Sequence, residues 1–346
     1  MGMNEGLRES GRSTFNKQFS HRDNIEVYGG SAETVDITPD RKTDKPPVLV
    51  APAWSCSIDV YKGALNTLAK EGRRALSLNH PRGAGNPQSL ERRGADVSAY
   101  PQAEVLKALN ILDFLDAKGL DQIDVVAHSE AGIHVAIAAM IDPKKFRNIV
   151  FFAPAGLIGE DTPARLAKGF AGQQIKEVSF FPPKIKFQGR PESLAAIPVS
   201  QEARDAALAE GRIIPDYAEI PKTPEEEHAA QAAGKGLMGY VREHPIRSIQ
   251  EGLAMAHTRI EDLLQTLHDK GIGIVIMSGV DDPVFQTEKM TKMVNSQMID
   301  GFLSIRGGHG EIGGHPRFMT AAEQMLSALE AKKKNRPLPT TGTSGE

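Results

Sequence analysis

The feature that most constrains the fold is a repeated alternation of short apolar runs with longer helical patterns. The runs VLVA at residues 48–51 and VVA at 125–127 are short and continuous, as is typical of strands buried on both faces of a parallel sheet. A helical pattern such as AEVLKALNILDFLDAKG, residues 103–119, follows most of these runs and ends at a glycine. The alternation predicts an α/β fold with a mostly parallel central sheet and helices on both faces.

This alternation stops at Gly156 and returns near Thr258, so we interpret the residues between as a mostly helical insertion with Pro-rich turns. Thr258 and Glu261 have the spacing of a capping box and predict that the next helix begins there. Two alternating runs around Gly29 and Gly30 predict a hairpin ahead of the parallel strands. The expected organisation is a flexible extension at 1–22, a first core segment at 23–155, a cap or lid at 156–257, a second core segment at 258–332 and a disordered tail at 333–346.

Composition excludes several classes of protein. The net charge is −3 without a long basic block, so no nucleic-acid partner is expected, and no apolar run is long enough to predict a membrane span. The N-terminus is polar and lacks the apolar core of a signal peptide. The only cysteine, Cys56, cannot form an internal disulfide and is typical of a reducing compartment, so we predict a cytoplasmic location. The tail sequence LPTTG, residues 338–342, resembles a sortase signal but lacks the apolar span that follows one, so we interpret it as a chance match.

A serine stands where one predicted strand turns directly into a helix. In VVAHSEAGIHV the small residues Ala127 and Ala131 flank Ser129 at two positions on either side, and Gly132 follows. Such a sharp turn strains the serine backbone, raises its hydroxyl above the sheet edge and directs the helix N-terminus to the same point. This geometry indicates a nucleophile, which needs a histidine as base and a carboxylate to orient that histidine. His128 is expected to pack beneath the serine without a chemical role.

Candidates for both partners follow in the chain. Asp281 and Asp282 come after the run IVIMSG, and His309 and His315 follow the last predicted strand in a Gly-rich segment. The carboxyl ends of parallel strands lie at one edge of a sheet, where open α/β folds build their sites. His309 directly follows its strand and is the preferred base, and the order serine, aspartate, histidine is typical of one such architecture.

Five segments together resemble the alpha/beta-hydrolase superfamily, in particular capped bacterial serine hydrolases of the esterase or lipase type. The resemblance extends over roughly residues 40–330, a span set by the strand–helix alternation. These segments, in chain order, are VAPAW, NHPRGAG, AHSEAG, SGVDDP and GGHG. The resemblance implies an alpha/beta-hydrolase fold with a helical cap, and a Gly-x-x-Asp turn that selects Asp282 over Asp281. A serine nucleophile argues against the epoxide hydrolase and haloalkane dehalogenase branches, which have an aspartate at that position.

The resemblance also implies an oxyanion hole made by the backbone N–H groups of Trp54 and Glu130. Alanines replace both glycines of the family's serine turn, and Pro52-Ala53 replaces its His-Gly pair. The carboxylate of Glu130 opposes the negative charge that such a hole stabilises, so its side chain must either pair with a cation or point away.

The sequence therefore predicts a hydrolase that cleaves a small-molecule ester or lactone through an acyl-enzyme on Ser129, with His309 and Asp282 completing the triad. No metal is expected, because the histidine spacing matches no zinc motif, and this mechanism requires no cofactor. An acyltransferase, an amidase or peptidase, and a non-catalytic ligand-binding protein on the same fold stay open as alternatives. Substrate identity and oligomeric state do not follow from the sequence.

Overall fold

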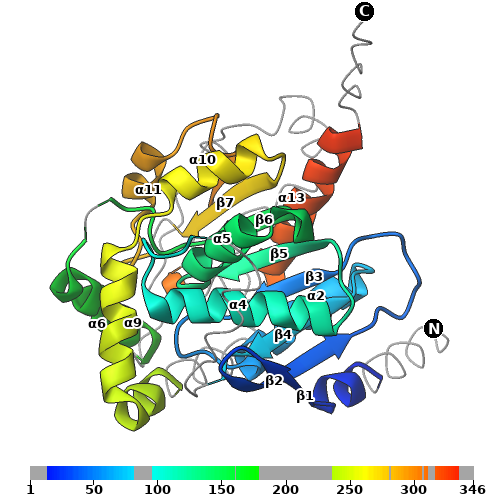
Figure 1. The fold of residues 1–346 in the computed structure, drawn as a ribbon, viewed down its shortest axis with the longest axis horizontal. Helices are drawn as coiled ribbons and strands as arrows, with labels where there is room; N and C mark the ends of the chain where they lie inside the picture. The colour runs from blue at the N-terminus through cyan, green and yellow to red at the C-terminus, as the bar shows by residue number, and fades with distance from the viewer. Residues whose placement is uncertain are drawn as a thin grey trace, which may run out of the picture.

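A single sheet organises the protein. The computed structural model describes residues 14–81, 96–159, 161–178, 236–279, 282–305, 308–310 and 316–334. Eight strands of these segments pair in the order β1-β2-β4-β3-β5-β6-β7-β8 (Figure 1). The strands are β1 (Asp23–Val27), β2 (Gly30–Ile37), β3 (Val48–Ala51), β4 (Ala75–Asn79), β5 (Ile123–His128), β6 (Phe146–Phe152), β7 (Gly273–Gly279) and β8 (Gly301–Ile305). Pairs from β4 to β8 are parallel, and β1 and β2 add an antiparallel hairpin at one edge. The predicted α/β class with a mostly parallel sheet is confirmed.

Helices cover both faces of the sheet. The described helices are α2 (Lys62–Lys70), α4 (Gln102–Ala117), α5 (Ala131–Ile141), α6 (Pro163–Val178), α9 (Pro245–His257), α10 (Glu261–Asp269), α11 (Thr287–Met293) and α13 (Pro316–Lys334), with short 3₁₀ helices at Ile58–Tyr61 and Pro143–Lys145. Side chains of α4, α5 and α10 share one hydrophobic core, and those of α2 and α13 share the other. Along β5, Val125 and Ala127 enter the first core and Val126 the second. This double burial explains why apolar residues predominate along the parallel strands.

The segment between β6 and α10 contains α6, a helix over residues 236–243, and α9. Helices α6 and α9 pack against each other and lie together at one end of the sheet (Figure 1). Residues 179–235, most of the predicted cap, lie outside the described residues.

One local prediction is wrong. Helix α10 begins at Glu261 with Ile260 as its N-cap, and no side chain caps it, so Thr258 and Glu261 do not form a capping box. Thr258 instead ends α9 and donates its backbone N–H to Ala254 at 2.9 Å. The reason is tertiary: Ile260 is fully buried and its N–H bonds to the Gly156 carbonyl at 3.1 Å, so packing determines where α10 starts.

The described part of the predicted N-terminal extension is helical over residues 14–20. Phe19 is buried there in the core beneath α2, so this part packs on the domain instead of being loosely attached. In the segments that the structure describes, no helix is long and apolar enough to cross a membrane.

A buried arginine ties the last helix to the sheet. Arg73 precedes β4, its side chain is fully buried, and its guanidinium bonds to Asp124 on β5 at 2.9 Å and to Glu330 on α13 at 2.7 Å. It also bonds to Glu323 on α13, whose other oxygen accepts from Lys45 at 2.7 Å. This cluster lies near the amino ends of the strands, so it joins α13 to the sheet at the edge away from the carboxyl ends.

Candidate active site

Ser129 occupies the turn between β5 and α5. Its φ of +59° lies in the left-handed region, which is strained for a residue with a side chain. Two backbone bonds hold this conformation: the Ser129 N–H donates to Phe152 at 2.8 Å, and the Ser129 carbonyl accepts from Ala155 at 3.0 Å. Gly132 allows the close approach, because a Cβ there would lie 2.7 Å from the Cβ of Pro154. The strained turn that the sequence predicts is present.

Asp282 and His309 follow β7 and β8, and the structure brings both to Ser129. Nε2 of His309 lies 2.9 Å from the Ser129 hydroxyl, and Nδ1 lies 2.8 Å from Oδ2 of Asp282. The other oxygen of Asp282 accepts the backbone N–H groups of Val284 and Phe285 at 2.7 and 3.0 Å. A carboxylate held in this way accepts the Nδ1 proton, so the lone pair on Nε2 faces the serine.

All three residues are shielded from solvent, with exposed fractions of 1% for Ser129, 4% for Asp282 and 5% for His309. The rings of Phe170 and Phe285 contact the imidazole edge to face, with centroids 5.9 and 5.1 Å away. The alternative residues Asp281 and His315 lie outside the described residues.

His128 makes a hydrogen bond to the backbone of His309. Its Nε2 lies 3.1 Å from the His309 carbonyl, which can only accept, so Nε2 carries the proton. Its Nδ1 then accepts from the Tyr61 hydroxyl at 2.8 Å, and that hydroxyl oxygen accepts the Ala53 N–H at 2.8 Å. Burial, followed by the neighbouring His309, lowers the pKa of His128 to about 3, so this ring is neutral. The chain of bonds links the loop after β3 to the backbone of His309.

Trp54 lies in a tight turn after β3. Cys56 donates its N–H to Ala53 at 3.0 Å, and Ser55 has a φ of +60°, so Trp54 and Ser55 are the two central residues of a β-turn. Strand β3 pairs with β5 in parallel register, Ala51 beside Ala127, so this turn and Ser129 lie at the same edge of the sheet. In the described part of the chain, the backbone N–H groups of Trp54 and Glu130 donate to no protein acceptor.

The Glu130 side chain pairs with a cation, which answers the question that the sequence leaves open. Its Oε1 lies 2.6 Å from Nζ of Lys107 on α4, and both side chains are buried. The same ammonium lies 2.9 Å from Glu251 on α9. The carboxyl group beside Ser129 is therefore paired with a cation from another helix.

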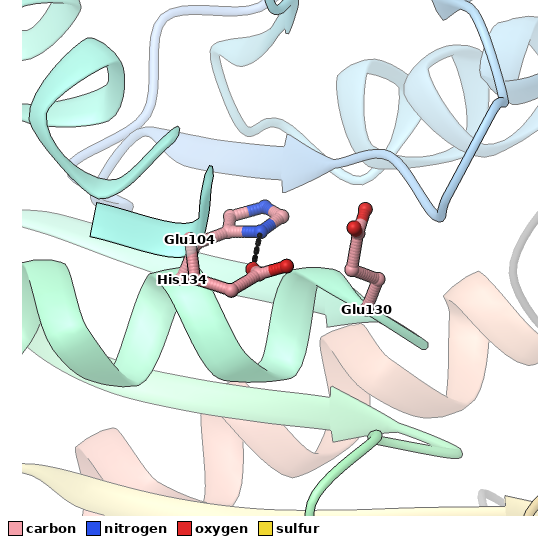
Figure 2. A group of neighbouring side chains, drawn as sticks. All are labelled: Glu104, Glu130 and His134. Carbon is pink, nitrogen blue, oxygen red and sulfur yellow. Dashed lines mark hydrogen bonds and ion pairs between the residues drawn. The ribbon is translucent and has the colours of Figure 1, made fainter. Parts of the chain in front are cut away.

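A donor cluster beside this pair has the spacing of a metal site. Figure 2 shows Glu104 and Glu130, with His134, whose Nδ1 is 3.1 Å from Glu104. One donor atom from each lies within 4.8 Å of the others. Lys107 already contacts Glu130, and a metal ion would have to displace this ammonium against charge repulsion. We therefore interpret the cluster as a buried ion-pair network.

Charges in this network affect one another strongly. Burial alone would raise the pKa of Glu251, but Lys107, Tyr240 and Arg247 together lower it to about 2. Burial alone would lower the pKa of Lys107, but the surrounding carboxylates raise it. Burial raises the pKa of Glu104 to about 7. Lys107 and Glu251 are therefore both charged near neutral pH.

Sequence reasoning missed Lys107 and Glu251. A signal for the first is present, because Glu104, Lys107 and Asn110 recur every three residues on α4 and are all buried. Polar side chains on one buried face of a helix need partners, so this spacing predicts a polar network. For Glu251 no comparable signal exists, since acidic residues are common in helices.

Residues 46–295 match the alpha/beta hydrolase fold family, and because this match covers most of the chain, the protein belongs to that family. Solved structures support the same fold. An esterase from Rhodococcus sp. ECU1013 is 15% identical with a TM-score of 0.55, and the alignment covers 89% of this chain and 99% of the esterase. Naproxen esterase from Bacillus subtilis is 11% identical with a TM-score of 0.53, and the alignment covers 92% and 96% of the two chains.

A bacterial membrane phospholipase A is 14% identical with a TM-score of 0.54 over 96% of this chain and 93% of the phospholipase. A search of curated proteins gives no significant match. Identities this low establish the shared fold, so the activity must be argued from the site itself.

Proposed function

We propose that this protein hydrolyses a small-molecule carboxylic ester or lactone by two successive acyl transfers, with Ser129 as nucleophile. One observation carries the proposal: the His309 ring lies within hydrogen-bond distance of both the Ser129 hydroxyl and Asp282. This arrangement meets the geometric requirement for an activated serine. The esterases among the structures of similar fold add support.

In the first transfer, Ser129 Oγ attacks the carbonyl carbon while Nε2 of His309 takes the hydroxyl proton. The carbonyl electron pair moves to oxygen and forms a tetrahedral oxyanion. When the carbonyl reforms, the bond to the alkoxy group breaks and His309 donates its proton to the departing oxygen. Asp282 stabilises the imidazolium during these steps and keeps its tautomer.

In the second transfer, water attacks the acyl-enzyme and gives a proton to His309. The acid departs and Ser129 recovers its proton from Nε2. We assign the oxyanion site to the backbone N–H groups of Trp54 and Glu130, which donate to no acceptor among the described residues. Removing one such donor typically costs about 3–4 kcal/mol of activation free energy.

We also propose that the insertion between β6 and α10 acts as a cap over the site. Phe170 on α6 contacts both His309 and Trp54, at centroid distances of 5.9 and 5.4 Å. This insertion would supply much of the wall that selects the substrate.

The test compares wild type with Ser129→Ala on p-nitrophenyl esters of short to long chain length and on several lactones. We expect the variant to lose at least about 10³-fold in kcat while it keeps the wild-type circular dichroism spectrum. Substantial turnover by folded Ser129→Ala would refute the nucleophile. A wild type that turns over an ester only when an alcohol or thiol acceptor is added would identify an acyltransferase instead.

A further inference from the structure

The side chains of the two proposed oxyanion residues converge on one carboxylate of the insertion. The indole Nε1 of Trp54 donates to Oε2 of Glu251 at 2.8 Å. Glu130 reaches the same carboxylate through Lys107, whose Nζ lies 2.6 Å from Glu130 and 2.9 Å from Oε1 of Glu251. Glu251 is on α9, far from both residues in sequence.

Every acceptor position of Glu251 is used. Its Oε2 also accepts the Tyr240 hydroxyl at 2.7 Å, and its Oε1 accepts Nε of Arg247 at 3.0 Å. The side chain has no exposed surface, so water does not compete for these bonds. A buried carboxylate with four donors is rigidly oriented, and charge-assisted bonds of this kind are stronger than neutral ones.

The turn at Trp54 needs such support. Ser55 has a positive φ, which costs free energy for a residue with a side chain, so the turn persists only where surrounding contacts enforce it. The indole of Trp54 also contacts the rings of Phe170 and Tyr240, with ring centroids 5.4 and 6.4 Å away. Its bond to Glu251 is the directional contact that fixes the rotation of the ring.

We propose that Glu251 is a positioning residue for hydrolysis: it holds Trp54 and, through Lys107, Glu130 so that their backbone N–H groups point at the developing oxyanion. The inference rests on the proposed function and extends it. Because Glu251 belongs to α9, the oxyanion site is complete only when this helix is seated against Trp54. The insertion then contributes to the rate as well as to the shape of the pocket.

Glu251→Gln is the central variant. In this variant the amide oxygen accepts from Lys107 and Arg247, so the amide NH₂ faces the indole N–H of Trp54. Both of these groups are donors, so the bond to Trp54 is lost. Because complete loss of an oxyanion donor costs about 10²–10³-fold in kcat, we expect a displaced donor to cost about 10–100-fold with KM changed less than about 3-fold.

The matched control is Glu323→Gln. Glu323 is an equally buried carboxylate that pairs with Arg73 and Lys45 away from the site. We expect it to lower stability and leave kcat at the wild-type value.

Trp54 is the only tryptophan of the chain, so its fluorescence reports directly on the proposed contact. Glu251→Gln should increase acrylamide quenching of this fluorescence, whereas Glu323→Gln should not. Trp54→Phe keeps an aromatic ring and the backbone N–H but removes the indole donor. It tests the same contact if Glu251→Gln fails to fold. We expect Trp54→Phe to lower kcat, and the double variant to be no slower than the slower single one.

Wild-type kcat in folded Glu251→Gln or in Trp54→Phe would overturn the inference, as would additive losses in the double variant. Increased quenching with wild-type kcat would also overturn it, because Glu251 would then be only structural. Failure of wild type to hydrolyse any ester is a different result and refutes the proposed function instead.

Discussion

Replacing Arg73 with methionine tests whether the buried cluster under α13 holds the fold together. Methionine fills a similar apolar volume but leaves Asp124, Glu323 and Glu330 without their shared cation. Removing one partner of a buried ion pair typically costs about 3–5 kcal/mol, since the remaining charge has lost both water and its counterion. With several carboxylates affected, we expect a loss of unfolding free energy near 5 kcal/mol.

The neighbouring arginine provides a matched control. Arg74 also makes a two-pronged contact, to Asp36 at 2.9 and 2.6 Å, but its side chain is 36% exposed. Pairs that remain in contact with water contribute about 0–1 kcal/mol, so Arg74→Met should cost less than about 1 kcal/mol. Urea unfolding followed by circular dichroism measures both variants under the same conditions.

The penalty of Arg73→Met should also depend on pH. Burial raises the pKa of Asp124 to about 6 in spite of the opposing effect of Arg73, and removing Arg73 raises it further. Above its unfolded pKa, the folded state then holds a proton that the unfolded state has released, so the stability of the variant falls as pH rises. The cost should therefore be smaller at pH 5 than at pH 8. Equal costs for the two arginine variants, or a larger Arg73→Met cost at pH 5, would refute this reasoning.

Two further predictions concern the surroundings of the site. Tyr61→Phe leaves the Ala53 N–H and His128 Nδ1 buried without their hydroxyl partner. Each unpaired group typically costs about 1–3 kcal/mol, so the variant should lose about 2–6 kcal/mol of unfolding free energy in urea. It should also have a lower kcat. A cost below about 1 kcal/mol would contradict the hydrogen-bond chain. Glu104 has a pKa of about 7 against an ordinary 4.5, so between these values the folded state holds the extra proton and stability falls as pH rises. Glu104→Gln weakens this dependence, so its stability relative to wild type should increase from pH 5 to pH 7.5; a constant difference would show that Glu104 does not titrate there.

Much of the fold could be predicted because its signals are local. Strands such as β5 and β7 are buried on both faces, so most of their residues are apolar. Helix α4 ends at Ala117, just before Gly119, whose φ is positive. The order of Ser129, Asp282 and His309 could be predicted for the same reason, since each lies within a few residues of the end of a strand. The structure brings these three side chains into contact, as expected.

What the sequence could not reveal depends on contacts between distant segments. The start of α10 is determined by burial of Ile260 against the loop at Gly156, and this overrides the capping preference of Thr258. Two partners of Glu251, Lys107 and Trp54, come from distant segments, and no periodicity of the sequence identifies them.

The Arg73 cluster also constrains when the protein can fold as it is synthesised. Arg73 is separated from Glu323 by 250 positions and from Glu330 by 257, and Lys45 from Glu323 by 278. The first strands therefore emerge from the ribosome long before the carboxylates of α13 exist. Until that helix is made, the guanidinium of Arg73, which is fully buried in the folded protein, can pair with Asp124 but not with Glu323 or Glu330. The nascent domain should stay open at this edge until α13 has emerged from the ribosome and can dock against Arg73.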